Sequence, residues 1–126
     1  MSQAPLSANI VFPDGLVGMP SLVRHHISAV PGSALYELVS DDDPSMGFIA
    51  ASGEHVKPGM AAALVDRGLA VAGEWVLVIL AVHGDPPQIT ANLAGPLVID
   101  MEKATARQVV IEDPDFPLQA PLPKES

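Results

Sequence analysis

The sequence contains no cysteine and few aromatic residues, and both shortages restrict what the chain can do. Without cysteine, the 126 residues can form no disulfide, no thiolate nucleophile and no cysteine-based zinc site. Aromatic residues make up only 4% of the chain although 48% is hydrophobic, so a core has to be built from Val, Ile, Leu and Ala. That composition favours a small β-barrel or sandwich over an aromatic-lined ligand pocket.

Basic residues are also scarce. Six Lys and Arg stand against 15 Asp and Glu, which gives a net charge of −9. The basic residues are scattered singly, whereas acidic residues gather at Asp41-Asp42-Asp43 and again between Glu112 and Asp115. A nucleic-acid-binding protein has to neutralise phosphates, so this charge argues against direct nucleic-acid binding. The charge either attracts a basic protein partner or only keeps the protein soluble.

The chain also lacks a hydrophobic run long enough to cross a membrane. Its most apolar stretch is residues 75–82, and a membrane-spanning helix needs about 20 apolar residues. The first twelve residues contain no Lys or Arg and do not resemble a secretory signal. We therefore expect a cytoplasmic protein that does not bind membranes.

Short apolar runs separated by Pro, Gly, Asp and Ser indicate a mainly β protein. We expect a small single-domain β-barrel-like fold with one short helix, which begins at Pro58 and ends before Gly68. Trp75–His83 is apolar at nearly every position and is expected to be a central strand covered on both faces. The other strands are expected at residues 9–12, 24–30, 34–39, 46–51, 89–93, 96–101 and 107–112.

The C-terminal residues differ from the rest of the chain in their proline content. Residues 1–118 are expected to form the barrel domain, and residues 119–126 an extended, Pro-rich C-terminal tail. From Phe116 onward the chain contains Pro117, Pro121 and Pro123, which prevent regular pairing. We expect this segment to be extended and loosely held.

The motifs of the common catalytic sites are absent. The sequence has no phosphate-binding glycine loop, no nucleophile elbow and no H-E-x-x-H zinc motif. A calcium loop that starts at Asp43 fails because Phe48 stands where glycine is required. We therefore expect a binding protein and not an enzyme, with no catalytic residue, metal or cofactor. The four histidines, at positions 25, 26, 55 and 83, are expected at the surface or at strand ends. A metal site formed by His25 and His83 is the weaker alternative.

Two polar residues interrupt an apolar stretch near residue 90. Thr90 and Asn92 alternate with apolar neighbours, so they would share one face of a strand. Asparagine is disfavoured in strands and needs a local reason to be there. Either its amide satisfies the loop before Gly95 and Pro96, or Thr90 and Asn92 line a polar recognition surface.

Five stretches together resemble the FliW family of bacterial flagellar assembly factors, in the order and spacing of that family. The most specific is Thr90-Ala-Asn-Leu93, which is followed by Pro96 and an apolar run. One departure is Gln119-Ala120, where the family has Arg-His. The five stretches lie within residues 12–19, 40–48, 89–100, 107–111 and 113–117.

The resemblance implies a small β-barrel-like fold with no known catalysis and two protein partners. These partners are flagellin and the RNA-binding translational regulator CsrA, which FliW antagonises so that flagellin is translated. Two alternatives remain: a small barrel enzyme or ligand-binding domain, and a chaperone of another secreted protein. The residues expected to contact partners are Met46, Phe48, Thr90, Asn92 and Gln108, with Asp42 and Asp43 steering the encounter. Core packing is the alternative role for Met46 and Phe48, and turn formation is the alternative for Asp42 and Asp43.

Overall fold

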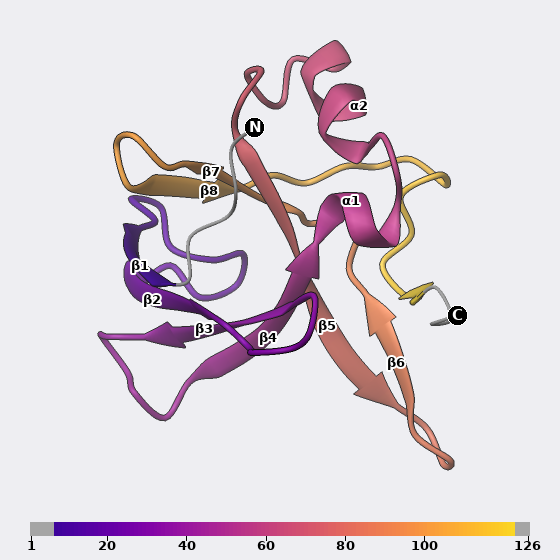
Figure 1. Ribbon diagram of the computed structural model, residues 1–126, viewed down its shortest axis with the longest axis horizontal. Helices are drawn as coiled ribbons and strands as arrows, with labels where there is room; N and C mark the ends of the chain where they lie inside the picture. The colour runs from indigo at the N-terminus through magenta and orange to yellow at the C-terminus, as the bar shows by residue number, and fades with distance from the viewer. Residues whose placement is uncertain (1–6, 123–126) are drawn as a thin grey trace.

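Nine strands form one strongly bent β-sheet in a computed structural model, which describes residues 7–122 (Figure 1). The first four strands follow one another as an antiparallel meander. They are β1 (Ser7–Val11), β2 (Arg24–Ala29), β3 (Leu35–Ser40) and β4 (Gly47–Ser52). The later strands are β5 (Trp75–His83), β6 (Gln88–Ala91), β7 (Leu97–Asp100), β8 (Thr105–Gln108) and β9 (Ala120–Pro121).

The sheet closes on itself into a barrel. Its ring runs β4-β3-β2-β1-β8-β7-β5, and antiparallel pairing between β5 and β4 completes it. The β1–β8 contact, which joins Val11 to Thr105, is parallel. The predicted fold class, a small and mainly β barrel-like domain, is confirmed.

Strand β5 is longer than its neighbours and contacts three of them. Its first residues pair with β7, residues 77–79 pair with β4, and residues 80–83 pair with β6. Beyond Ile79 the strand leaves the barrel and forms a hairpin with β6, which β9 extends by one short strand. In Figure 1, β4 and β5 cross and then diverge toward the lower edge of the picture.

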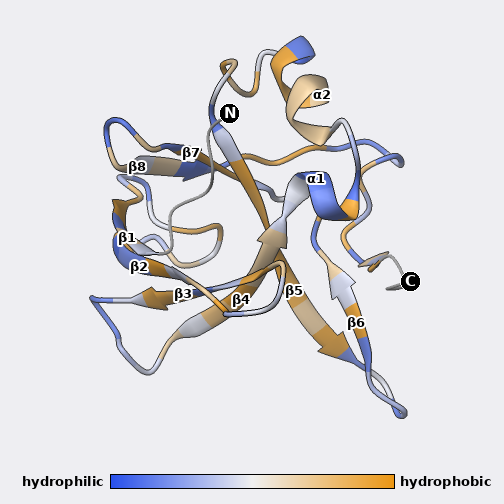
Figure 2. Ribbon diagram, in the orientation of Figure 1, coloured by the Kyte–Doolittle hydropathy of each residue, from blue (hydrophilic) through white to orange (hydrophobic). Residues whose placement is uncertain are grey.

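The apolar side chains divide into two core clusters, one inside the barrel and one outside it. Successive residues of a strand point to opposite faces, so Leu77 lies in the interior cluster while Val76 and Val78 lie in the outer one. The predicted burial of β5 on both faces is therefore right for residues 76–78. It is wrong for Ala81 and Val82, which are exposed. Figure 2 shows hydrophobic colouring along much of β5, including its exposed end.

The predicted helix is α2 (Met60–Asp66), but it begins two residues after Pro58. Gly59 has a φ of 87°, a left-handed conformation that separates Pro58 from the helix. The end is as predicted: Gly68 has a φ of 73° and donates its N–H to the Val65 carbonyl at 3.0 Å. The helix covers the outer core cluster through Met60 and Leu64.

A second helical segment, α1 (Gly53–Val56), was not predicted. It has four residues, too few to show a helical period in the sequence. Its Glu54 carboxylate accepts the N–H groups of Gly59 at 3.0 Å and Ala61 at 2.8 Å. The segment therefore supplies a cap for the start of α2, whose own first turn has no acidic residue.

The C-terminal segment is fixed to the barrel, which corrects the expectation that it is loosely held. Phe116 is 3% exposed, and Lys57 and Arg67 lie over its ring at 5.1 and 4.7 Å from the centroid. Further on, Ala120 is buried in β9, which pairs with β6. The expectation is wrong for residues 116–122, and residues 123–126 lie outside the described part of the chain.

The strand predicted at residues 107–112 is β8 (Thr105–Gln108), which is shorter than predicted and begins two residues earlier. The chain then follows the loop after β6: Val109 donates its N–H to the Pro96 carbonyl at 3.0 Å, and Ile111 donates to the Ala94 carbonyl at 2.8 Å. The strand was predicted because Val109 and Ile111 alternate with Gln108 and Glu112, but from Val109 onward the chain lies against an irregular partner.

Candidate partner-binding site

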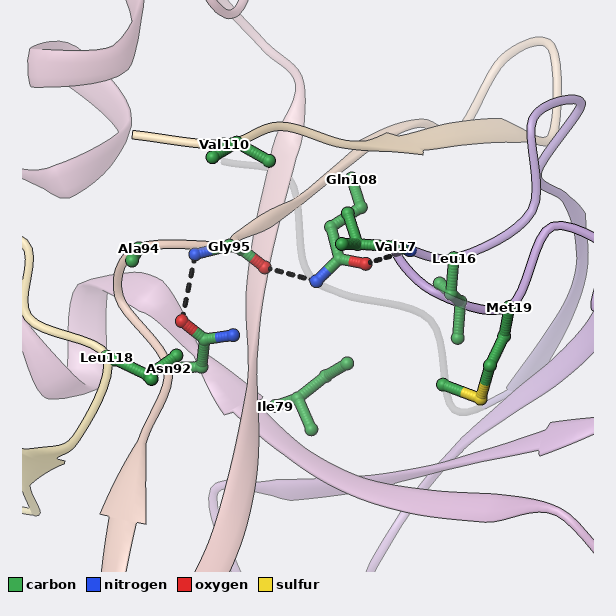
Figure 3. Close-up of a pocket in the computed structure, with 10 residues that line it drawn as sticks. All are labelled: Leu16, Val17, Met19, Ile79, Asn92, Ala94, Gly95, Gln108, Val110 and Leu118. Carbon is green, nitrogen blue, oxygen red and sulfur yellow. Dashed lines mark hydrogen bonds between the residues drawn. The ribbon is translucent and has the colours of Figure 1, made fainter. Parts of the chain in front are cut away.

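An open pocket of about 320 Å³ lies where three segments meet beside Ile79 of β5. The loop before β2 forms one side, the turn after β6 forms the floor, and the segment after β8 forms the other side (Figure 3). Two of the predicted contact residues, Asn92 and Gln108, lie together in it. The lining consists of Leu16, Val17, Met19, Ile79, Asn92, Ala94, Gly95, Gln108, Val110 and Leu118.

A chain of amide hydrogen bonds forms the floor of the pocket. The Asn92 Oδ1 accepts the Gly95 N–H at 2.9 Å, and the Gly95 carbonyl accepts Gln108 Nε2 at 2.9 Å. The Gln108 Oε1 in turn accepts the Val17 N–H at 2.8 Å. The side chain of Gln108 thus joins β8 to two loops, and the local structural role predicted for Asn92 is confirmed.

Gly95 is necessary for this close arrangement. A Cβ atom at this position would lie 2.9 Å from Gln108 Nε2 and 3.0 Å from Asn92 Nδ2. Any larger residue would push the two amides away from the backbone that they contact. The Gly-Pro pair that ended the predicted strand therefore also shapes the pocket floor.

The rim of the pocket is apolar and exposed to solvent. Val17, Val110 and Leu118 are 57%, 60% and 63% exposed, and no charged residue among residues 7–122 lines the pocket. An exposed apolar group of this kind is typical of a surface that contacts another protein. The chemistry available is apolar contact and hydrogen bonding, with no ionisable group to transfer a proton.

Sequence reasoning did not identify the three rim residues. Val110 breaks the alternation of apolar and polar residues after Arg107, and this exception was a signal that could have found it. Val17 lies in a loop, where exposed apolar residues are common. Leu118 lies in the segment that was expected to be loosely held, so nothing in the sequence placed it beside the other two.

Asp42 is held by the fold and is not a free surface charge. Its Oδ2 accepts the backbone N–H groups of Val23 at 2.9 Å and Arg24 at 2.7 Å, and its Oδ1 accepts Arg24 Nη2 at 2.9 Å. The backbone and side-chain hydrogen bonds from Arg24 lower the pKa of Asp42 to about 2. These contacts support the turn-forming role, and a steering role remains a prediction.

The other predicted contact residues of this region lie beside Asp42. Asp43 Oδ1 accepts the backbone N–H of Ser45 at 3.2 Å and its hydroxyl at 2.6 Å, which is a local turn. Met46 is half-buried just before β4, and Phe48 is half-buried against the barrel interior. None of Asp42, Asp43, Met46 and Phe48 lines the pocket that contains Asn92 and Gln108.

Thr90 also lies outside the pocket. It is a half-buried residue of β6 and pairs with Ala81 of β5 on one side and Pro121 of β9 on the other. Asn92 follows the end of β6, where its N–H donates to the Ile79 carbonyl at 2.9 Å. Of the two residues, only Asn92 is among those that line the pocket in the described part of the chain.

One histidine contradicts the expectation that all four lie at the surface or at strand ends. His25 is fully buried and packs edge-on against Phe12, with ring centroids 4.9 Å apart. Burial lowers its pKa, and neither ring nitrogen has a hydrogen-bond partner within residues 7–122. No group of three His, Asp or Glu side chains in the described residues is arranged to hold a metal.

Two further carboxylates with lowered pKa values are explained by their neighbours. Hydrogen bonds from Arg107 lower the pKa of Glu74, and those from the Asp115 backbone and from Arg67 lower the pKa of Asp113. Both carboxylates lie in ion pairs away from the amide-floored pocket. The lowered pKa values show that the ion pairs stabilise the ionised form of both carboxylates. Neither carboxylate therefore becomes a proton donor or acceptor near pH 7.

The sequence matches the FliW protein family model over residues 2–122. The chain belongs to the FliW family. Two relatives support the assignment over most of their length. The flagellar assembly factor FliW of Symbiobacterium thermophilum is 32% identical over 119 residues, which cover 88% of this chain and 86% of that protein. The flagellar assembly factor FliW 2 of Desulfotalea psychrophila is 30% identical over 124 residues, with 90% and 80% covered.

A solved structure shows the same fold. The crystal structure of a flagellar assembly factor FliW aligns with a TM-score of 0.72 and covers 94% of this chain and 87% of that chain. The sequence identity is only 20%, so this likeness concerns the fold. The predicted resemblance to the FliW family is therefore confirmed by sequence and by architecture.

The two described helices, α1 and α2, have four and seven residues. Neither of them combines the length and the apolar character that a membrane-spanning helix requires.

Proposed function

We propose that the protein is a cytoplasmic flagellar assembly factor that binds flagellin and antagonises a CsrA-type translational regulator, without catalysing a reaction. The observation that carries this proposal is the family match over residues 2–122. The pocket is compatible with it, because its exposed rim is apolar and its polar floor groups are hydrogen-bonded within the protein. A catalytic site would instead need ionisable groups that converge on a substrate.

The two partners call for different surface chemistry. A net charge of −9 favours a basic partner such as the RNA-binding regulator, because opposite charges accelerate encounter. The uncharged pocket suits an apolar side chain presented by flagellin. Binding of flagellin then competes with, or is coupled to, binding of the regulator, so that free flagellin controls its own translation.

Calorimetry with purified flagellin and purified regulator from the same organism tests the proposal. Each should bind, and saturating flagellin should weaken regulator binding at least about tenfold, which corresponds to about 1.4 kcal/mol of coupling. The proposal is contradicted if flagellin or the regulator does not bind.

A pair of surface variants tests the role of the pocket. Leu118→Glu places a charge on the apolar rim and should weaken flagellin binding at least about tenfold. The matched control is Val71→Glu, because Val71 is 68% exposed but does not line this pocket. Equal effects of the two variants would contradict the assignment of flagellin to the pocket.

A further inference from the structure

One edge of β5 has no partner strand over its last residues, within the part of the chain that the structure describes. Pairing with β4 stops at Ala50 and Ile79, whereas pairing with β6 on the other edge continues to His83. Figure 1 shows β4 and β5 diverging after they cross. The edge of β5 at residues 80–83 therefore faces the opening between the two strands.

The backbone groups at this edge are available for hydrogen bonding. The Ile79 carbonyl accepts the Asn92 N–H, so the backbone groups of Ile79 point toward the β6 side. Successive residues in a strand direct their N–H and C=O groups to alternate edges. Val82 therefore directs both groups away from β6, into the opening where β4 no longer pairs.

The free edge carries none of the usual protections against an added strand. Edge strands are commonly shortened, charged or interrupted by proline. The outermost strand, β9, is protected in this way, because it has two residues and one is Pro121. Residues 80–83 are Leu-Ala-Val-His, with no Lys, Pro or acidic residue, and Val82 is 67% exposed.

An apolar pair lies beside the free edge. Val82 is paired across the hairpin with Ile89, which is 49% exposed. Directly paired residues of neighbouring strands point to the same face of the sheet. An added strand would therefore place one of its side chains next to an exposed apolar surface, and specificity would come from that side chain.

The charge around the opening restricts the partner. Residues 35–52 and 75–91, the two hairpins that diverge, contain no Lys or Arg. Asp41 and Asp43 lie in the loop before β4, and Asp85 lies in the turn after β5. Within residues 7–122 none of these three carboxylates is in an ion pair, in contrast to Asp42. An incoming segment is therefore favoured if it carries positive charge.

We propose that an extended segment of the basic CsrA-type regulator pairs with β5 at residues 80–83 as an added strand. The inference rests on the proposed function for the identity of the partner. Backbone hydrogen bonds to Val82 provide affinity, an apolar side chain of the partner covers Val82 and Ile89, and a Lys or Arg approaches Asp41, Asp43 or Asp85. In this complex the regulator is held by the acidic, open end of the hairpin and not by the uncharged pocket.

Amide exchange measured by NMR on the wild-type protein, free and saturated with purified regulator, tests the pairing directly. The Val82 amide should exchange rapidly in the free protein and at least about tenfold more slowly in the complex. The amides of Ala81 and His83 serve as internal references, because they face β6 and should be protected in both states. Unchanged exchange at Val82 in the saturated complex would overturn the proposal.

A backbone variant provides the second measurement. Val82→Pro removes an N–H that faces the opening and leaves the β5–β6 hydrogen bonds in place. It should weaken regulator binding at least about tenfold, whereas Val82→Thr, which retains the N–H and the branched shape, should change it less than about threefold. A folded Val82→Pro variant with wild-type affinity contradicts the proposal, and the exchange measurement decides it if this variant does not fold.

The charge argument has its own variant pair. Asp41→Asn combined with Asp85→Asn should slow association with the regulator and flatten its dependence on salt. Asp14→Asn combined with Glu112→Gln removes the same charge from exposed residues elsewhere and should have a smaller effect. Equal effects of the two double variants would show that net charge, and not the acidic opening, attracts the regulator, which contradicts this part of the proposal.

The outcomes separate this inference from the proposed function. If the wild-type protein does not bind the regulator, both the proposed function and the strand addition are contradicted. Wild-type protein that binds the regulator without protection of the Val82 amide leaves the proposed function standing and contradicts strand addition.

Discussion

The two ends of β5 have similar apolar sequences and opposite environments. Val76, Leu77 and Val78 are at most 4% exposed, because β4 and β7 pair with this end and apolar clusters lie on both of its faces. Ala81 and Val82 are exposed, and within residues 7–122 they pair only with β6. The difference shows that an apolar strand becomes core only where neighbouring segments cover it, and that the uncovered remainder is available to a partner.

The largest expected effect comes from removing the cover over the buried end. Phe116→Ala should lower the free energy of unfolding by about 3–5 kcal/mol, because it deletes a buried ring and the contacts of Lys57 and Arg67 with it. Urea denaturation measures this change. Leu118→Ala, in the same segment but 63% exposed, should cost less than about 0.5 kcal/mol. A small effect of Phe116→Ala would mean that the C-terminal segment does not support the core.

Matched truncations within β5 test the comparison itself. Leu77→Ala should destabilise the protein by about 2–5 kcal/mol, because Leu77 is fully buried in the barrel interior. Val82→Ala should change the unfolding free energy by less than about 0.5 kcal/mol, because Val82 is 67% exposed. Both values come from denaturant titration. Similar costs at the two positions would refute the division of β5 into a structural and an open end.

A smaller effect, dependent on pH, is expected from the barrel interior. Burial lowers the pKa of His25 below 6.5, so the unfolded chain takes up a proton at a higher pH than the folded protein does. Stability should therefore fall as pH decreases below about 6.5, by at most about 1.4 kcal/mol per pH unit from this residue. The His25→Leu variant should lose this slope in denaturation curves recorded between pH 7 and pH 5. Parallel curves for wild type and variant would exclude His25 as the cause.

The smallest effect at neutral pH is expected in the loop before β4. The pKa of Asp42 is about 2 in the folded protein, compared with the ordinary value of 3.8 expected in the unfolded chain. The ionised form of Asp42 therefore stabilises the fold above pH 3.8. This contribution should disappear as pH falls from about 4 to about 2. Thermal unfolding of Asp42→Asn should converge with that of wild type in this range. The exposed control Asp14→Asn should show no such convergence.

The sequence was informative wherever the signal is local. The apolar run of β5, the turn residues between strands and Gly68 at the end of α2 all indicated the correct element, because each depends on neighbouring residues. The hydrogen bond from Gly95 to Asn92 was also anticipated, since the two residues are three positions apart. The resemblance to the FliW family also predicted the correct family for the chain, although it assigned no structural role to individual residues.

The candidate site was predicted only in part, for a physical reason. Asn92 was recognised as a polar residue in an apolar stretch and Gln108 was expected to contact partners, but the rim residues Val17 and Leu118 are separated by about a hundred positions in the chain. Nothing in the sequence near either residue shows that both face one pocket. The hydrogen bond from the Val17 N–H to Gln108, which closes the floor, also depends on barrel closure.

By itself, then, the sequence determined the mainly β class, the acidic character and the family of this protein, because composition, periodicity and motif order are properties of the chain. Only the tertiary structure decided that Phe116 and His25 are buried, that Asp42 is bound by Arg24, and that the end of β5 has a free edge. Burial and pairing depend on which distant segments come together, and that depends on how the barrel closes.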